Sequence, residues 1–138
     1  LMLSSELNCR FWKRTMFRND LFNHSDFENI ENGFKTVIVF NWEHPGFKGH
    51  FPSRPVVPGV LLMQMVKECF ETFLAVSTVI EGADLKFTKP VTPQTAPELK
   101  LEVTFANDND RYKVKSGGHD GETKFFKINM ELVKGGLQ

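Results

Sequence analysis

Hydrophobic side chains between residues 60 and 76 recur at steps of three and four along the chain. This spacing is typical of a helix that buries one face. Further apolar residues widen that face and leave only a narrow polar stripe, of the kind usually found on a solvated helix surface. The stripe consists of Gln64, Lys67, Glu68 and Glu71. The pattern therefore predicts one long helix, enclosed by the protein over most of its circumference.

Much of the remaining chain alternates apolar and polar residues with the period of two that is typical of strands. Strands are predicted over residues 78–87, 97–105, 111–116 and 122–133. Asn32-Gly33 separates two further apolar runs, residues 21–30 and 34–42, and Asn-Gly favours a tight hairpin turn. The sequence thus predicts about six strands and one helix.

The order of these elements points to an α+β fold. Two strands precede the helix and four antiparallel strands follow it, so a curved antiparallel sheet wrapped around one long central helix, a hot-dog fold, fits best. A cystatin-like cone and a small barrel with a helical plug have similar periodicity and stay open as alternatives. With 138 residues, the chain has the length of a single domain, 1–138.

Composition and charge narrow the function classes. Seventeen basic residues balance seventeen acidic ones, so no overall positive field favours nucleic acid. No stretch approaches the roughly 18 apolar residues of a membrane span. Two cysteines cannot form a disulfide framework, which favours the cytoplasm. Fourteen phenylalanines need a generous core or a surface for self-association, so a homo-oligomer is expected.

Known cofactor and metal motifs are missing from the sequence. The cysteines and the four histidines match no metal-binding spacing, and the chain contains neither a glycine-rich phosphate loop nor a serine nucleophile elbow. We therefore expect no metal and no cofactor.

The densest group of chemically useful residues lies in the loop before the helix, residues 43–59, which holds four prolines and three glycines. His50 lies in this loop, and an imidazole accepts a proton near neutral pH. Pro58 presets the entry to the helix. The backbone N–H groups of Gly59 and Val60 lie at the helix start, where they can stabilise a developing oxyanion. A base and an oxyanion hole are thus adjacent in the sequence.

Two segments resemble the 3-hydroxyacyl-acyl-carrier-protein dehydratases of the hot-dog superfamily. They are GHFPSRPVVPGVLLMQ, residues 49–64, and ADLKFTKPVTP, residues 83–93. The resemblance extends over roughly residues 21–133. It implies a cofactor-free homodimer with two sites at the interface, each taking a histidine from one subunit and an acid from the other subunit's central helix. The acyl chain would be carried on phosphopantetheine.

Carried over by position, the resemblance makes His50 the base that removes the α-proton and the Gly59 N–H the donor to the thioester oxygen. Phe51, Pro58 and Val60 would contact the substrate. The family's acid would fall five residues after Gly59, where this chain has Gln64. An amide cannot transfer a proton as an acid does.

Three interpretations of this replacement stay open. In the first, Gln64 orients the substrate hydroxyl while His50 shuttles the proton. In the second, Glu68, one turn along the same helix face and near the substrate, supplies the acid. In the third, the protein binds acyl thioesters without eliminating water.

The expected activity is the dehydration of 3-hydroxyacyl thioesters of acyl carrier protein or CoA to trans-2-enoyl thioesters, in fatty acid or polyketide- or polyene-type synthesis. The alternatives are an acyl thioesterase and a non-catalytic, carrier-binding partner of an active dehydratase. Lysines and an arginine near the two segments are candidates for receiving an acidic carrier protein, although solvated side chains explain them equally well. They are Lys48, Arg54, Lys86 and Lys89.

Overall fold

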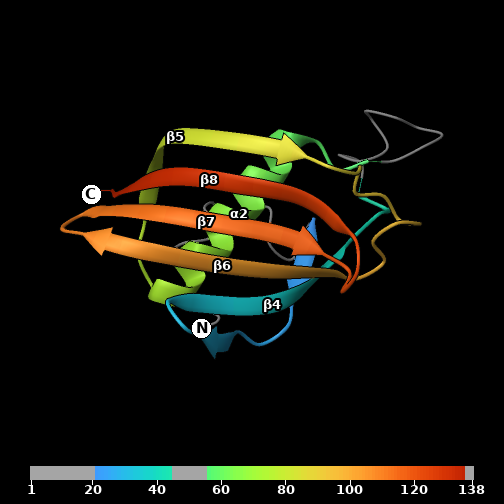
Figure 1. Ribbon diagram of the computed structural model, residues 1–138, viewed down its shortest axis with the longest axis horizontal. Coiled ribbons are helices and arrows are strands. Elements are labelled where there is room, and N and C mark those ends of the chain that lie inside the picture. The colour runs from blue at the N-terminus through green and yellow to red at the C-terminus, as the bar shows by residue number, and fades with distance from the viewer. Residues whose placement is uncertain (1–20, 45–55, 136–138) are drawn as a thin grey trace.

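A computed structural model describes residues 21–44 and 56–135 of the chain. In this part, one antiparallel sheet of seven strands packs against a single long helix (Figure 1). The strands are β2 (Phe22–His24), β3 (Glu28–Ile30), β4 (Gly33–Phe40), β5 (Thr78–Phe87), β6 (Leu99–Asp108), β7 (Arg111–His119) and β8 (Lys124–Lys134). Their order across the sheet is β2-β4-β6-β7-β8-β5, and β3 also pairs with β4.

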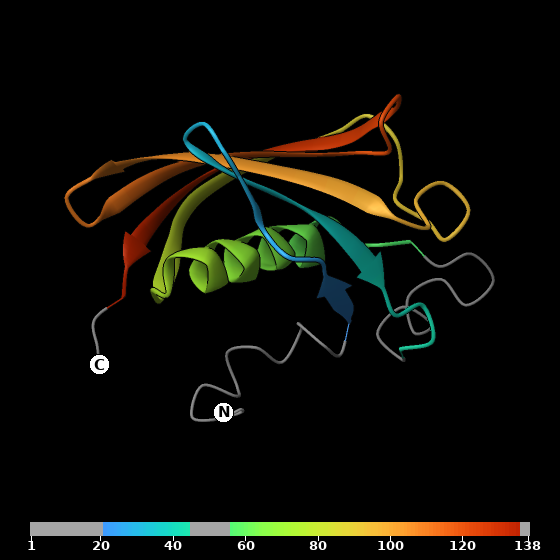
Figure 2. The same cartoon turned by 90° about the horizontal axis from the view of Figure 1, so that it is seen from below.

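Helix α2 (Gly59–Leu74) lies across one face of the sheet, and the strands curve over it (Figure 2). The centre of its apolar side is buried completely, since Leu62, Val66, Cys69 and Phe70 are 0% exposed. The alternate residues of the strands that face the helix are buried as well, as in β6 and β7. The core is therefore the layer between α2 and the concave face of the sheet, which is the α+β arrangement predicted from the sequence.

The abundant phenylalanines join the helix to the sheet inside this core. The rings of Phe73 in α2 and Phe34 in β4 stack with centroids 4.5 Å apart. The ring of Phe70 makes edge-on contacts with Phe105 and Tyr112 at 5.1 Å and 5.0 Å. Aromatic pairs prefer these offset and edge-on geometries. Many of the aromatic side chains are thus buried against one another in the core.

The predicted elements are present, and most of their bounds shift by one to three residues: β4, β6, β7 and β8 begin or end at other residues than predicted. Strand β5 has the predicted bounds, and the helix begins one residue earlier and ends two residues earlier than predicted. The first predicted strand, residues 21–30, is divided into β2 and β3, which gives seven strands instead of about six. Where the strand is interrupted, the Ser25 N–H still donates to the Val37 oxygen at 2.9 Å. The Ser25 hydroxyl in turn accepts the Val37 N–H at 2.9 Å and contacts the Thr36 hydroxyl at 3.0 Å, so a side chain takes over one partner of the ladder.

The hairpin turn lies one residue before the predicted Asn-Gly pair. Ile30 pairs with Gly33, so Glu31 and Asn32 form the turn, and Asn32 has a left-handed φ of 65°. Gly33 is already part of β4. A side-chain carbon at Gly33 would lie 1.9 Å from the Val103 carbonyl oxygen of β6. The glycine is thus required by close strand packing rather than by the turn itself.

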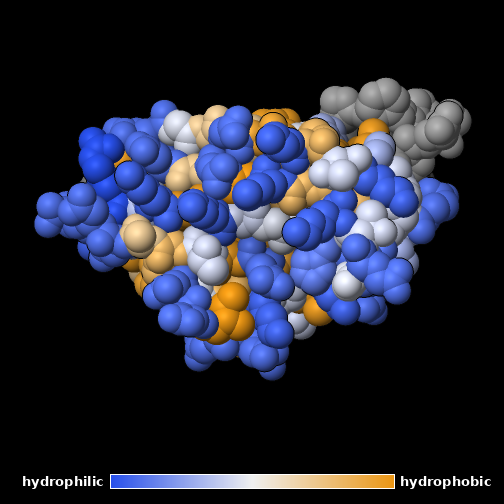
Figure 3. Space-filling view, viewed as in Figure 1, coloured by the Kyte–Doolittle hydropathy of each residue, from blue (hydrophilic) through white to orange (hydrophobic). Residues whose placement is uncertain are grey.

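The other face of the sheet is mostly hydrophilic, as the space-filling view shows (Figure 3). Among the described strands, β5 is at one end of the sheet and pairs only with β8. Two large side chains of β5 are exposed, Val79 at 57% and Phe87 at 47%. In the described part of the chain, no helix has the length and apolar character that crossing a membrane requires.

Candidate functional site

Helix α2 begins without a side-chain cap. Pro58 is its N-cap residue, with φ −64° and ψ 152°, and its carbonyl oxygen accepts the N–H groups of Leu61 at 3.0 Å and Leu62 at 3.2 Å. Within the described residues, no acceptor is recorded for the N–H groups of Gly59 or Val60. Because the first turn of a helix carries partial positive charge, these two groups are suited to a negatively charged oxygen.

A pocket of about 410 Å³ opens beside this helix start. Most of its walls are apolar, and its lining consists of Val56, Val57, Pro58, Gly59, Phe87, Thr88, Lys89 and Pro90. Backbone hydrogen bonds fix both walls: the Val57 N–H donates to the Val91 oxygen at 3.0 Å, and the Thr88 N–H donates to the Phe125 oxygen at 2.8 Å. The pocket thus combines a mostly apolar lining with the backbone at the helix start, a composition typical of sites for small molecules.

Gly59 lets β5 approach the helix start closely. A side-chain carbon at this position would lie 2.5 Å from Leu85 Cδ2 and 3.4 Å from the Phe87 ring. Any side chain here would push against β5, and against Phe87, which also lines the pocket. The missing side chain therefore keeps this backbone accessible.

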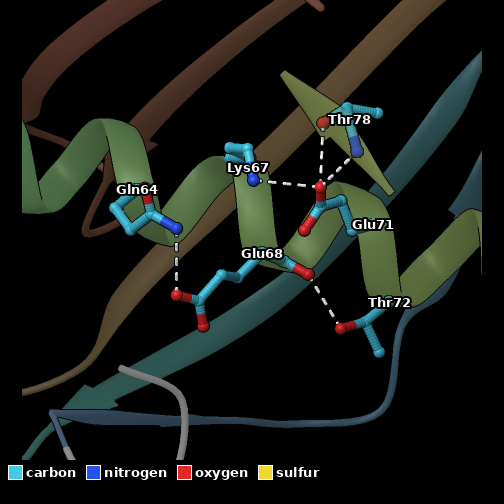
Figure 4. A network of polar contacts seen from close by, with 6 residues as sticks. All are labelled: Gln64, Lys67, Glu68, Glu71, Thr72 and Thr78. Atoms are coloured by element: carbon cyan, nitrogen blue, oxygen red, sulfur yellow. Dashed lines mark hydrogen bonds and ion pairs between the residues drawn. The ribbon is translucent and has the colours of Figure 1, made fainter. Parts of the chain in front are cut away.

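Gln64 and Glu68 form a pair one turn apart on α2 (Figure 4). The Gln64 Nε2 group donates a hydrogen bond to Glu68 Oε2 at 3.2 Å. Gln64 is partly buried, and Glu68 is only 2% exposed. The expectation that the polar stripe of the helix is a solvated face is thus wrong for Glu68, whose carboxyl group is inside the protein.

Lys67 and Glu71, in the next turn of the polar stripe, also belong to a hydrogen-bond network inside the protein. Glu71 Oε2 accepts hydrogen bonds from Lys67 Nζ at 3.0 Å, from the Thr78 N–H at 2.6 Å and from the Thr78 hydroxyl at 2.9 Å. The Lys67 and Glu71 side chains are 16% and 12% exposed. These bonds join the end of α2 to the start of β5, which explains why the stripe is polar but not solvated.

A model of the ApeI-like protein family, described as ApeI dehydratase, matches residues 26–125 of this chain. The match includes both segments of the dehydratase resemblance. The chain belongs to the ApeI-like dehydratase family.

Curated relatives of this ApeI-like chain are 3-hydroxyacyl-acyl-carrier-protein dehydratases. The FabZ dehydratase of Herpetosiphon aurantiacus is 35% identical over an alignment of 118 residues, and the match covers 78% of this chain and 78% of that protein. That of Anaeromyxobacter sp. (strain K) is 35% identical over 71 residues, and the ApeI-like chain spans 46% of its length. The dehydratase resemblance predicted from the two segments is thus confirmed.

Two solved structures share the fold of this ApeI-like chain. The dehydratase heterocomplex ApeI:P from Xenorhabdus doucetiae matches with a TM-score of 0.65 and 18% identity, over 82% of this chain and 98% of that chain. Cj0977, a sigma28-regulated virulence protein from Campylobacter jejuni, has a TM-score of 0.65 and 18% identity, over 100% of this chain and 95% of that chain. At this identity the likeness concerns the fold, and it confirms the hot-dog architecture.

The structure of the ApeI-like chain brings some of the predicted site residues together. Pro58 and Gly59 line the pocket, and Val60 next to them is 66% exposed. Gln64 and Glu68 contact each other but are not part of the pocket lining of the same chain. The predicted base His50 and the predicted substrate contact Phe51 lie outside the described residues, as do Lys48 and Arg54.

Sequence reasoning missed the contribution of β5 and the turn after it. Phe87, Thr88 and Pro90 line the pocket, and Leu85 contacts Gly59. The signal was present, because these residues lie in the second segment of the resemblance, residues 83–93. The sequence pattern indicates only a strand and a turn for this segment. In the structure, part of it forms the pocket wall that faces the start of α2. Among the described residues, no group of three or more metal-ligating side chains comes together.

Proposed function

We propose that the protein dehydrates 3-hydroxyacyl thioesters to trans-2-enoyl thioesters, acting in the cytoplasm in fatty acid or polyketide- or polyene-type synthesis. The main support for this proposal is the structure at the start of α2. The uncapped start of α2, with Gly59 and Val60 N–H groups that no described residue accepts, borders an apolar pocket directly after the loop that contains His50. Membership in a dehydratase family favours this use of the pocket over others.

In the proposed reaction, the thioester carbonyl lies against the Gly59 amide and the acyl chain lies along the apolar pocket wall. His50 removes a proton from C2, and negative charge moves to the thioester oxygen. Helix-start amides stabilise such an oxyanion, and removing one donor of this kind costs about 100- to 1,000-fold in rate. The C2 electrons then form the double bond to C3 while the C3–O bond breaks, and the departing oxygen takes a proton from an acidic group of the site and leaves as water. No cofactor is needed for these steps.

We further propose that the active form is a homodimer joined through β5. In the described sheet the outer edge of β5 has no neighbouring strand, and Val79 on β5 is 57% exposed. An open strand edge is a template for pairing with another chain. Sedimentation velocity should therefore give a dimer, and Val79→Lys should shift it toward monomer. A wild-type monomer at micromolar concentration would contradict this assembly.

The carrier is proposed to be an acidic acyl carrier protein that docks at the pocket mouth. Lys89 lines the pocket, and Lys86 lies opposite Lys127 on the exposed face of the sheet. Such local charge attracts an acidic partner even though the net charge of the chain is zero. Lys89→Glu should then raise the KM for carrier-bound substrate more than the KM for the same acyl group on CoA. Equal effects on both substrates would favour a CoA thioester.

Gln64 supports a second candidate, a subunit that binds acyl carriers for an active dehydratase, because an amide donates hydrogen bonds but does not act as a general acid. Incubation with 3-hydroxyacyl and saturated acyl thioesters separates the candidates. Enoyl product supports dehydration, free thiol supports a thioesterase, and tight binding without turnover supports the carrier-binding subunit. The single variant Gln64→Glu tests where the acid lies. A higher dehydration rate indicates that position 64 lacks an acid that the reaction needs, and an unchanged or lower rate in a folded variant indicates that another group donates the proton.

A further inference from the structure

We infer that Glu68 is the proton donor for the departing 3-hydroxyl group, and that Gln64 holds this hydroxyl against it. The inference rests on the dehydratase function proposed above. It assigns the missing acid to a residue one helical turn beyond the position that the family resemblance predicts.

Geometry on α2 favours this assignment. Long side chains on a helix lean toward its N-terminus, so a residue at position 68 reaches back over position 64. The observed contact agrees with this direction, since the Gln64 Nε2 group lies 3.2 Å from Glu68 Oε2. A hydroxyl group that contacts the Gln64 amide is thus next to the Glu68 carboxyl group.

The helix carries one other carboxyl group, and that one is committed to the fold. Glu71 accepts three hydrogen bonds, from Lys67 and from the backbone and side chain of Thr78. Figure 4 shows that the Glu71 carboxyl group lies toward Thr78, whereas the Glu68 carboxyl group lies toward Gln64. Glu68 is therefore the acid on α2 that is placed to serve position 64.

Burial makes Glu68 unlike an ordinary surface acid. Its side chain is withdrawn from solvent, with 2% exposure, and it is carried by the middle of a rigid helix rather than by a loop. A carboxyl group in this position is held in a defined orientation by its contacts rather than by solvent. The bond from Gln64 is one of these contacts and keeps the carboxyl group beside the amide.

The proposed step balances as follows. His50 takes the proton from C2, the electrons of the C2–H bond move to the thioester oxygen to give an enolate, and they return from the enolate to form the C2=C3 double bond. The C3–O bond breaks, and its oxygen takes the proton of the Glu68 carboxyl group and leaves as water. Transfer of a proton from the His50 imidazolium to the Glu68 carboxylate then restores the starting state.

The test exchanges the two side chains. Glu68→Gln keeps the size of the side chain but removes the acid, and should lower kcat at least about 100-fold while KM stays within about threefold. Adding Gln64→Glu to this variant returns an acid to the pair and should recover at least about tenfold of the lost kcat. Glu71→Gln, one turn further along α2, is the matched control, and its kcat should stay within about threefold of wild type in folded protein.

Each result bears on a distinct claim. If wild-type protein forms no enoyl product from any 3-hydroxyacyl thioester, the proposed function fails, and this inference fails with it. If wild type is active but Glu68→Gln keeps its kcat, or if the exchange variant stays as slow as Glu68→Gln, only the role of Glu68 is overturned. Should Glu68→Gln not fold, Glu68→Asp replaces it: a kcat about tenfold lower at unchanged KM supports the inference, and an unchanged kcat overturns it.

Discussion

The Thr78 backbone N–H donates a hydrogen bond of 2.6 Å to the carboxylate of Glu71, seven residues earlier in the chain. This bond crosses the tight connection between the end of α2 and the start of β5. Ala75, in this connection, has a left-handed φ of 57°, and its N–H is among the groups that close the helix end on the Glu71 carbonyl. Glu71 thus joins the end of the helix to the first residue of the edge strand β5, at the end of that strand away from the pocket.

Replacing Glu71 should lower the stability of the fold. Glu71→Leu leaves the buried Thr78 N–H and hydroxyl groups without their acceptor, which should reduce the free energy of unfolding by about 1–3 kcal/mol. Urea denaturation followed by circular dichroism measures this change. Glu98→Leu, at an exposed loop position, is the control and should change the free energy of unfolding by less than about 0.5 kcal/mol. Equal effects at both positions would contradict the network.

Gly33 should tolerate no side chain. Its added Cβ would overlap the Val103 carbonyl oxygen at 1.9 Å, so Gly33→Ala forces β4 away from β6 and should cost about 3 kcal/mol of stability. Gly117→Ala is the matched control in a central strand, because its Cβ would meet only ordinary contact, 3.6 Å from the Phe126 oxygen. Thermal unfolding of both variants tests the difference, and a stable Gly33→Ala protein would show that the two strands are not this close.

The turn between β7 and β8 should show a defined response to acid. Hydrogen bonds from the backbone N–H groups of Thr123 and Glu122 hold the pKa of the Asp120 carboxyl group below its ordinary value of 3.8. Because the folded pKa is lower than the unfolded one, the stabilisation is complete above the ordinary pKa and is lost as the pH falls through the folded pKa. An NMR titration of the Asp120 carboxyl carbon should give a midpoint below 3.8; a midpoint at or above it would contradict these bonds.

Gly59→Ala tests the contact that keeps the helix start open. The new methyl group would press on Leu85 Cδ2 at 2.5 Å, and the displaced helix start should lower the dehydration rate by up to about 100-fold. Leu85→Ala removes the opposing methyl groups, so the double variant should regain part of the rate that Gly59→Ala loses. A Gly59→Ala protein with unchanged kcat would contradict the role of this backbone.

The fold was predictable because its signals are local and strong. Apolar residues at helical spacing defined α2 to within two residues at either end. The predicted strand at residues 78–87 has the same bounds as β5, and the clearest alternation, from Leu99 to Phe105, lies in β6. Gly33 was expected in the hairpin turn but lies in β4. A glycine is required there by the close approach of β6, which lies far away in the sequence. The spacing of apolar residues along the sequence does not show how closely two distant strands pack.

The sequence predicted the kinds of residues that form the candidate site, but not how they pack. A loop histidine before a helix that begins Pro-Gly indicated a base and an oxyanion hole, and Pro58 and Gly59 do line a pocket. The burial of Glu68 was not predictable, because a polar stripe on a helix has the same sequence pattern whether it meets water or an internal network. Only the three-dimensional packing shows that Glu68 bonds to Gln64 and Glu71 to Thr78.

The most direct test of the central claim is the mass of the product formed from a 3-hydroxyacyl thioester of acyl carrier protein. Wild-type protein should yield an acyl chain lighter by one water molecule, the 2-enoyl thioester, and folded His50→Ala should yield none. A folded wild-type protein that leaves the substrate intact, or a His50→Ala variant that dehydrates it at the wild-type rate, would contradict the account.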